Sequence, residues 1–221
     1  DVGAKEIHYG TYQFKDAEKS FAAARPNPDL WAGRSVAGNS TRDNTLTITG
    51  GNHRDAYGGW TVGTGTTEAD QDDSRKNTVS VTGGTLTGNL YGGYTNKAGG
   101  NATENQVTIA GGEIQGTLYG GHLADAAATG NATGNTVTIT GGKMKDVYGG
   151  YTANAAAGKT TGNTVTLGDG THALATGTKI DGTLYGGSRT GVGQDEDNLL
   201  HVKANAEAKN IKNFAKLKFD L

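Results

Sequence analysis

Residues 117–142 read TLYGGHLADAAATGNATGNTVTITGG, and nearly the same phrase occurs before and after this stretch. Residues 89–112 read NLYGGYTNKAGGNATENQVTIAGG, and residues 146–170 read DVYGGYTANAAAGKTTGNTVTLGDG. An active site normally occurs once in a sequence, and its residues differ in type and in role. A phrase repeated in register instead indicates one structural unit that is stacked on copies of itself.

Each copy of the phrase has two fixed positions. The first is an asparagine that opens an alternating run, and it occurs at Asn44, Asn77, Asn105, Asn135 and Asn163, with a weaker sixth copy at Asn198. The second is an aromatic residue followed by small residues, and it occurs at Trp31, Tyr57, Tyr91, Tyr119, Tyr148 and Tyr185. The sequence therefore contains six copies of a unit of about 28 residues, within the range of known structural repeats.

The alternating run has the pattern of a β-strand. In the segment 136–140, TVTIT, β-branched apolar residues alternate with threonine, so one face is apolar and the other polar. The following glycine pair permits a tight turn, and a second short strand such as 113–121, EIQGTLYGG, comes next, whose leucine, isoleucine and aromatic positions are expected to point inward. One such unit cannot bury its apolar face alone, but parallel stacking at about 4.8 Å lets each copy cover the next.

The sequence thus predicts an all-β repeat fold, a β-solenoid of the right-handed parallel β-helix type, with a short helical or irregular N-terminal cap. Residues 1–28 are expected to form this cap or a divergent coil, residues 29–197 the repeats, and residues 198–221 the last coil of a longer solenoid. A helix is predicted over 16–25, before Pro26. In this fold the five repeat asparagines would form an amide ladder, and the five repeat tyrosines a stack. A β-propeller is the alternative architecture.

Composition excludes several classes of function. The chain has 38 glycines and two prolines in 221 residues without a Gly-X-Y period, which excludes collagen. A net charge of −2 with a sequence pI near 6.2 gives no electrostatic footprint for nucleic acid. The absence of cysteine excludes disulfides, thiolate metal sites and cysteine nucleophiles.

The repeated NTVTITGG…LYGGYT…GNATGNTVTI, closing with NFAKLKFDL, resembles the glycine-rich repeats of bacterial autotransporter passenger domains, over roughly residues 29–221. The resemblance implies a secreted β-helix on the surface of a Gram-negative cell, commonly an adhesin. The fragment would then belong to a longer passenger that an outer-membrane barrel anchors. Its partner would be a host glycan, a host surface protein or a like molecule on a neighbouring cell.

Two sets of residues are candidates for ligand binding. The insertion at residues 64–76 carries Glu68, Asp70, Asp72 and Asp73, and clustered carboxylates suit calcium, although the segment lacks the order of a calcium loop. This insertion is the first expected contact site. Tyr94 and Tyr151 follow the repeated glycine pairs and would stack on sugars if they face outward. His122 occupies the same slot and is expected to be a surface substitution.

Two other functions remain open at this point. A polysaccharide-active β-helix enzyme, a lyase or a glycosidase, would need convergent carboxylates. Glu113, Asp146 and Asp181 lie near corresponding places in successive copies, but they form no clear pair. No catalytic residue, resident cofactor or metal site is therefore predicted. A ligand-free spacer is the third alternative.

Overall fold

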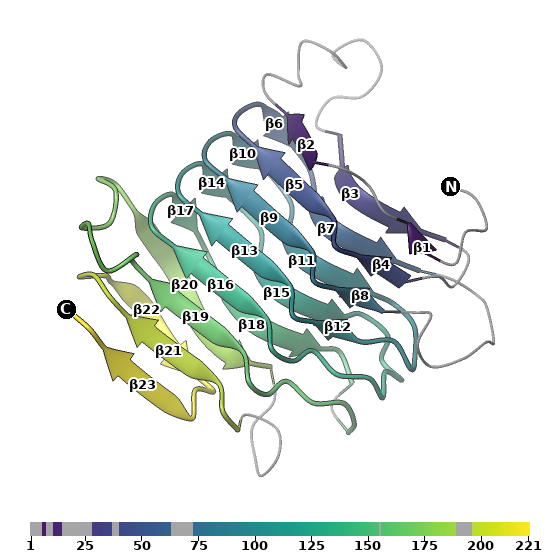
Figure 1. The fold of residues 1–221 in the computed structure, drawn as a ribbon. Coiled ribbons are helices and arrows are strands. Elements are labelled where there is room, and N and C mark those ends of the chain that lie inside the picture. Colours follow the sequence, from purple (N-terminus) through teal and green to yellow (C-terminus); the bar gives the residue numbers. More distant parts are fainter. Residues whose placement is uncertain are drawn as a thin grey trace.

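The chain forms a parallel β-solenoid of about six turns in the computed structural model (Figure 1). The structure describes residues 6–7, 11–14, 28–36, 40–62, 73–154, 156–188 and 196–221. The sequence-predicted fold class is confirmed, and the propeller alternative is excluded because every strand pair described is parallel. The helix predicted over 16–25 lies outside the described residues. No helix in the described part of the chain has the length and hydropathy needed to cross a bilayer.

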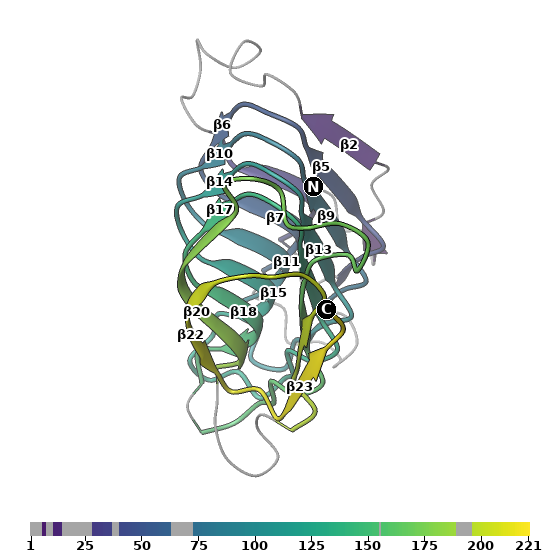
Figure 2. The same cartoon turned by 90° about the vertical axis from the view of Figure 1, so that its left-hand side faces the viewer.

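The strands form three sheets that run along the solenoid, and the view in Figure 2 shows the two larger sheets on opposite sides of the coil. The four-stranded sheet has the order β1 (Glu6–Ile7), β4 (Ser40–Arg42), β8 (Ser74–Arg75) and β12 (Ala102–Thr103). The eight-stranded sheet has the order β2 (Thr11–Phe14), β5 (Thr45–Ile48), β9 (Thr78–Val81), β13 (Gln106–Ile109), β16 (Thr136–Ile139), β19 (Thr164–Leu167), β21 (Leu199–Val202) and β23 (Lys216–Phe219).

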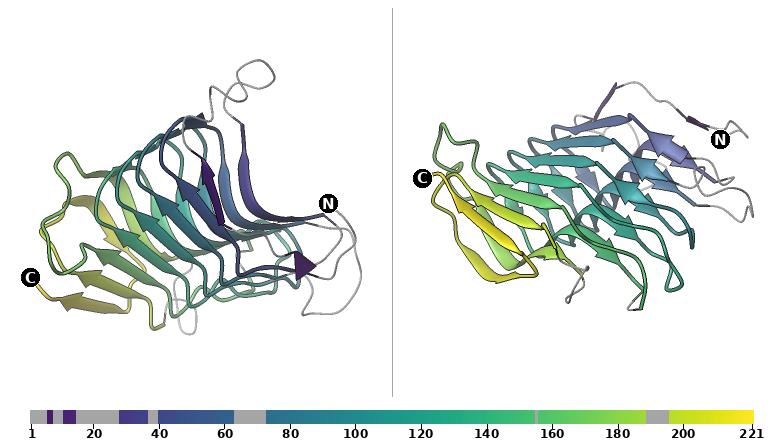
Figure 3. Two further views of the ribbon diagram at one scale, coloured as in Figure 1. Left: turned by 45° about the horizontal axis from the view of Figure 1, so that its top comes forward. Right: turned by 60° about the horizontal axis from the view of Figure 1, so that its bottom comes forward.

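The third sheet has eleven strands and occupies the opposite side of the coil (Figure 3). Its first row is β3 (Leu30–Ser35), β7 (Ala56–Thr61), β11 (Leu90–Thr95), β15 (Leu118–Leu123), β18 (Val147–Thr152) and β20 (Lys179–Gly187). From β20 the sheet continues through β17 (Lys143–Met144), β14 (Glu113–Ile114), β10 (Thr85–Leu86) and β6 (Asn52–His53), while β22 (Ala208–Lys212) also pairs with β20.

Equivalent residues of successive coils lie directly beside one another. Val107 pairs with Val79 on one side and Val137 on the other. This register stacks the apolar face of each alternating strand into one continuous core, in which the strand valines, leucines and isoleucines are almost fully buried. The thin core explains how a chain with only 33% hydrophobic residues forms a stable fold, because each coil shares its core with two neighbours.

The repeat asparagines form a continuous ladder of hydrogen bonds inside the solenoid. Each side-chain amide donates to the Oδ1 atom of the next asparagine, over 2.7–3.2 Å, from Asn44 through to Asn198. Each Oδ1 atom also accepts the backbone N–H of the preceding asparagine, as Asn135 does from Asn105 at 3.0 Å. All six residues have no exposed surface, so the ladder satisfies polar groups that would otherwise be costly to bury.

Candidate functional site: an aromatic array on the eleven-stranded sheet

The repeated segment LYGGYT is bent at its two glycines. In β11, Leu90 and Thr95 are fully buried, whereas Tyr94 is half-buried on the outer side and Tyr91, which is 7% exposed, lies against it. Both glycines between them face the interior, where a Cβ atom on Gly93 would lie 2.4 Å from Asn105 Nδ2. Side chains three residues apart point to opposite faces of a straight strand. Because of the bend they meet outside instead, with the Tyr91 and Tyr94 ring centroids 5.2 Å apart at 79°.

The bend, repeated in each coil, creates two parallel ranks of rings that we call the aromatic array. The first rank consists of Trp31, Tyr57, Tyr91, Tyr119, Tyr148 and Tyr185, and the second of Trp60, Tyr94, His122 and Tyr151. Within a rank, successive rings stack with centroids 4.2–6.4 Å apart and planes within 17° of parallel. Between the ranks, the rings meet edge to face. Neighbouring rings of one rank therefore cover one another's faces, and the ring edges point outward.

The two ends of the second rank differ. At the first coil, the slot holds Arg34, whose guanidinium carbon lies 4.9 Å from the centroid of Trp60 and so covers its face. At the other end the rank stops at Tyr151, since the register places Ser188 in the following coil's slot. No ring in the described part of the chain stacks on the second face of Tyr151. The first rank continues one coil further, to Tyr185, which leaves a step in the array.

Burial sets the protonation of the array. Desolvation raises the pKa of five tyrosine hydroxyl groups above the usual value of 10, those of Tyr57, Tyr91, Tyr94, Tyr119 and Tyr148. These five phenols consequently remain neutral at physiological pH and keep their O–H donors. Most of the rings are half-buried, so their outer edges and hydroxyl groups form a polar-edged aromatic surface.

A row of polar side chains runs along the first rank, two residues before each ring. It consists of Asp29, Asp55, Asn89, Thr117, Asp146 and Thr183. Several members accept the backbone N–H of the next coil, as Asp55 does from Asn89 at 2.6 Å and Asp146 from Thr183 at 2.7 Å. The Asn89 Nδ2 atom donates to the hydroxyl oxygen of Tyr91 at 2.9 Å. The row therefore places carboxylate and amide groups beside the rings.

The acidic insertion is only partly described. Glu68, Asp70 and Asp72 lie outside the described residues. Asp73 is 5% exposed, and its Oδ1 atom accepts both the backbone N–H and the Nδ2 group of Asn101, at 2.8 and 2.9 Å. The structure thus places Asp73 in the solenoid wall, as one rung of a second polar ladder, and not among exposed loop ligands. In the described part of the chain no group of three or more His, Asp and Glu side chains could hold a metal.

The histidines depart from the sequence-based expectation. His122 was expected on the surface, but it is 9% exposed, because it lies between the rings of Tyr94 and Tyr151. His53 also occupies a repeat position, because it pairs in register with Leu86 and is fully buried. The repeat pattern in the sequence did not reveal this position. Histidine is tolerated at both positions because an imidazole ring fits where an aromatic or aliphatic side chain stands in neighbouring coils.

His122 makes the stability of the fold sensitive to acid. Burial lowers the pKa of His122 from 6.5 to about 3, so the unfolded chain binds a proton between these pH values that the native chain does not. Stability is therefore full above pH 6.5 and falls as the pH drops towards 3. We expect His122→Tyr to remove this loss, by up to about 3 kcal/mol at pH 4. Urea unfolding at pH 7 and pH 4 measures it.

The exposed His172, replaced by tyrosine in the same way, controls for the number of histidines, because its side chain is 80% exposed. An unchanged pH dependence in His122→Tyr would show that the imidazole is not buried as a neutral ring.

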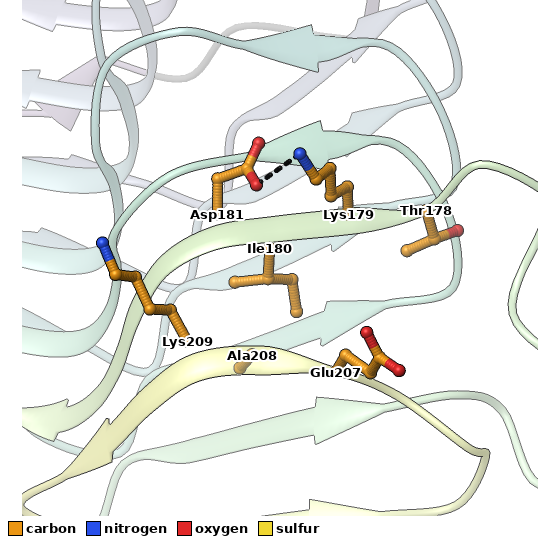
Figure 4. A pocket seen from close by; sticks show the side chains of 7 residues that line it. All are labelled: Thr178, Lys179, Ile180, Asp181, Glu207, Ala208 and Lys209. Atoms are coloured by element: carbon orange, nitrogen blue, oxygen red, sulfur yellow. Dashed lines mark ion pairs between the residues drawn. The ribbon is translucent and has the colours of Figure 1, made fainter.

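The carboxylates that an enzyme would need do not converge. Glu113 pairs in register with Lys143, Asp146 is a rung of the polar row, and Asp181 forms an ion pair with Lys179 at 2.7 Å. Figure 4 shows this ion pair at the rim of a cavity of about 370 Å³ between β20 and β22, which also contains Glu207 and Lys209. Each carboxylate in this cavity has a lysine close by in sequence, and the cavity is broad and open.

One further cluster has the composition of a catalytic triad but not its connectivity. The Nδ1 atom of His172 lies 2.6 Å from Thr171 Oγ1 and 3.1 Å from Asp169 Oδ2. A base that is oriented by a carboxylate and activates a hydroxyl uses its two different ring nitrogens for these contacts. Both contacts here use the same nitrogen, so the cluster is a surface turn.

Comparison of the chain with protein-family models, with curated proteins and with solved structures gives no match. The aromatic array is accordingly the candidate site that the geometry itself defines.

Proposed function

We propose that this chain is a rigid, surface-exposed adhesive segment of a secreted bacterial autotransporter passenger, and that the aromatic array is its glycan-binding face. The autotransporter assignment rests on the sequence resemblance alone. The adhesive role rests on one structural observation, the step where the second rank ends at Tyr151 above Ser188.

The step offers what an internal ring of the second rank, such as Tyr94, lacks. Tyr94 is stacked on both faces, by Trp60 and His122, so a sugar ring cannot stack on it. Tyr151 is stacked on one face only, by His122, within the described residues. A sugar ring seated on the other face would take the place of the missing aromatic rung and would meet the first rank at Tyr185.

The surroundings of the step also suit a carbohydrate. Asp146 belongs to the polar row beside the first rank, and the neutral phenols nearby can donate hydrogen bonds. Rigid aromatic side chains give large contact area at low conformational cost, which favours binding on a scaffold that does not move. Binding at one step is weak, and several copies of the protein on one cell would supply avidity.

A binding measurement with matched variants tests the proposal. The labelled chain is applied to a glycan array, and the strongest hit is titrated with Tyr151→Leu and Tyr94→Leu. We expect Tyr151→Leu to weaken binding at least about tenfold, as at an aromatic hot spot. Tyr94→Leu removes an equivalent ring with covered faces, so its affinity should stay within about threefold of the original. The spacer alternative predicts no glycan binding, and equal losses in both variants would place the contact elsewhere.

A further inference from the structure

The outer face of the eight-stranded sheet carries a regular array of hydroxyl groups from β5 to β19, which we call the threonine face. One rank consists of Thr45, Thr78, Gln106, Thr136 and Thr164, and the other, two residues further along each strand, of Thr47, Ser80, Thr108, Thr138 and Thr166. Nine of these ten positions bear a hydroxyl group, and none bears a charge.

The pairing makes this face a flat rectangular net. The five strands pair in parallel and in register at all four residues of each strand, without a bulge. Equivalent side chains therefore repeat at about 4.8 Å along the solenoid and at about 6.6 Å along each strand. Threonine has a restricted χ1 angle, and nine of the ten side chains are half-buried, so the hydroxyl groups are held in place.

The lack of charge is specific to this face. The other two sheets place Arg42 and Arg75, and Glu113, Lys143 and Lys179, at outward or corner positions. Past β19 the net ends, and β23 carries Lys216 and Lys218 at the corresponding positions. Exposed sheet faces usually mix charged residues for solubility, and strand propensity alone does not exclude them. A face kept neutral over five coils suits a neutral partner.

The size and chemistry of the face narrow the partner further. Five strands of four residues cover roughly 24 by 13 Å, or about 300 Å². A stable protein–protein interface buries about 800 Å² on each partner, so a second protein would bind too weakly. No aromatic ring lies in the net, which distinguishes it from the aromatic array proposed to bind glycans.

We infer that the threonine face binds ice. In ice each water molecule hydrogen-bonds tetrahedrally to four others at about 2.75 Å, so next-nearest oxygens lie about 4.5 Å apart, close to the repeat of about 4.8 Å of the hydroxyl groups along the solenoid. Each threonine hydroxyl both donates and accepts hydrogen bonds, so it matches water at every lattice point. A lattice contacts all nine hydroxyl groups at once, so many weak contacts add up although the face is small. This inference concerns a different sheet and does not depend on the proposed glycan binding.

Thermal hysteresis of the purified chain, measured with observation of crystal shape, tests the inference. We expect a gap between melting and freezing temperatures and faceted crystals. Thr108→Lys places a cation at the centre of the net, where contact with ice would desolvate it, and should lower the hysteresis at least about tenfold. If Thr108→Lys destabilises the fold, as a lower urea concentration at the unfolding midpoint would show, Ser80→Lys in the neighbouring coil tests the same effect on hysteresis.

The matched control is Thr176→Lys, because Thr176 is an exposed threonine in the 168–178 loop and is not one of the ten positions of the net. Its hysteresis should stay within about twofold of the original, since the cation there remains in water. Round crystals without hysteresis overturn the inference. So do a Thr108→Lys variant that keeps full hysteresis, and binding to microcrystalline cellulose without any effect on ice.

Discussion

Asn105→Ala is expected to lower the free energy of unfolding by about 3–5 kcal/mol, one of the two largest single effects in the chain. The side chain makes four hydrogen bonds. Its Oδ1 atom accepts the backbone N–H of Asn77 at 3.1 Å and the Nδ2 group of Asn77 at 2.9 Å. Its Nδ2 group donates to Ser74 O and to Asn135 Oδ1, at 2.9 and 3.0 Å. Alanine leaves these partners buried, and a buried polar group without a partner costs about 1–3 kcal/mol.

Urea unfolding measures the effect, and Asn96→Ala provides the control. Asn96 follows β11 and is exposed, so removal of its side-chain amide should change the free energy of unfolding by less than about 0.5 kcal/mol. A cost below about 1 kcal/mol for Asn105→Ala would mean that water enters the corner and replaces the ladder.

Much of the fold could be predicted from the sequence because the same residue types recur at equivalent positions of each repeat. The recurring asparagine and the alternation around Val107 and Val137 favour parallel stacking over a propeller, since stacking places each copy beside the next with its apolar face covered. Six in-register copies therefore predict both the strand type and the neighbours of each strand. The fold that results is the β-solenoid that the phrase predicts.

The candidate site was only partly predictable, and the reason is local. The sequence pattern predicts that Tyr91 points inward with the apolar residues of its strand, and it leaves the direction of Tyr94 open. The bend at Gly92 and Gly93 brings both rings outside, and it depends on how closely the backbone approaches Asn105 across the coil. The second rank, and with it the step at Tyr151, follows from this tertiary contact.

His122 and Asp73 show the same limit. Taken singly, a histidine and an aspartate next to an acidic insertion are typical of a surface. In the structure both are buried, because each occupies a slot whose neighbours in the adjoining coils supply a ring stack or a hydrogen-bond ladder. In a solenoid the environment of a residue is set by its equivalents one coil away, which lie 28–33 residues distant for the ladder contacts of Asp73.

Gly93→Ala is expected to lower the free energy of unfolding by about 3 kcal/mol, because the added Cβ atom has no room. It would lie 2.4 Å from Asn105 Nδ2 and 2.7 Å from Asn105 Cγ. The asparagine is held by its four hydrogen bonds, so it cannot move aside without breaking the ladder. Gly99→Ala is the matched control, since a Cβ atom there meets nothing within 4 Å. That variant should stay within about 1 kcal/mol of the original.

A double-mutant cycle separates the clash from any general loss of strand structure. Asn105→Ala removes the atoms that Gly93→Ala strikes, so the cost of the double variant should fall short of the sum of the single costs by at least about 1 kcal/mol. Additive costs would mean that the glycine is needed for its own backbone conformation. The bend that exposes the second aromatic rank would then be independent of the asparagine ladder. Coupled costs would show that the buried ladder and the outer aromatic array are stabilised by one contact.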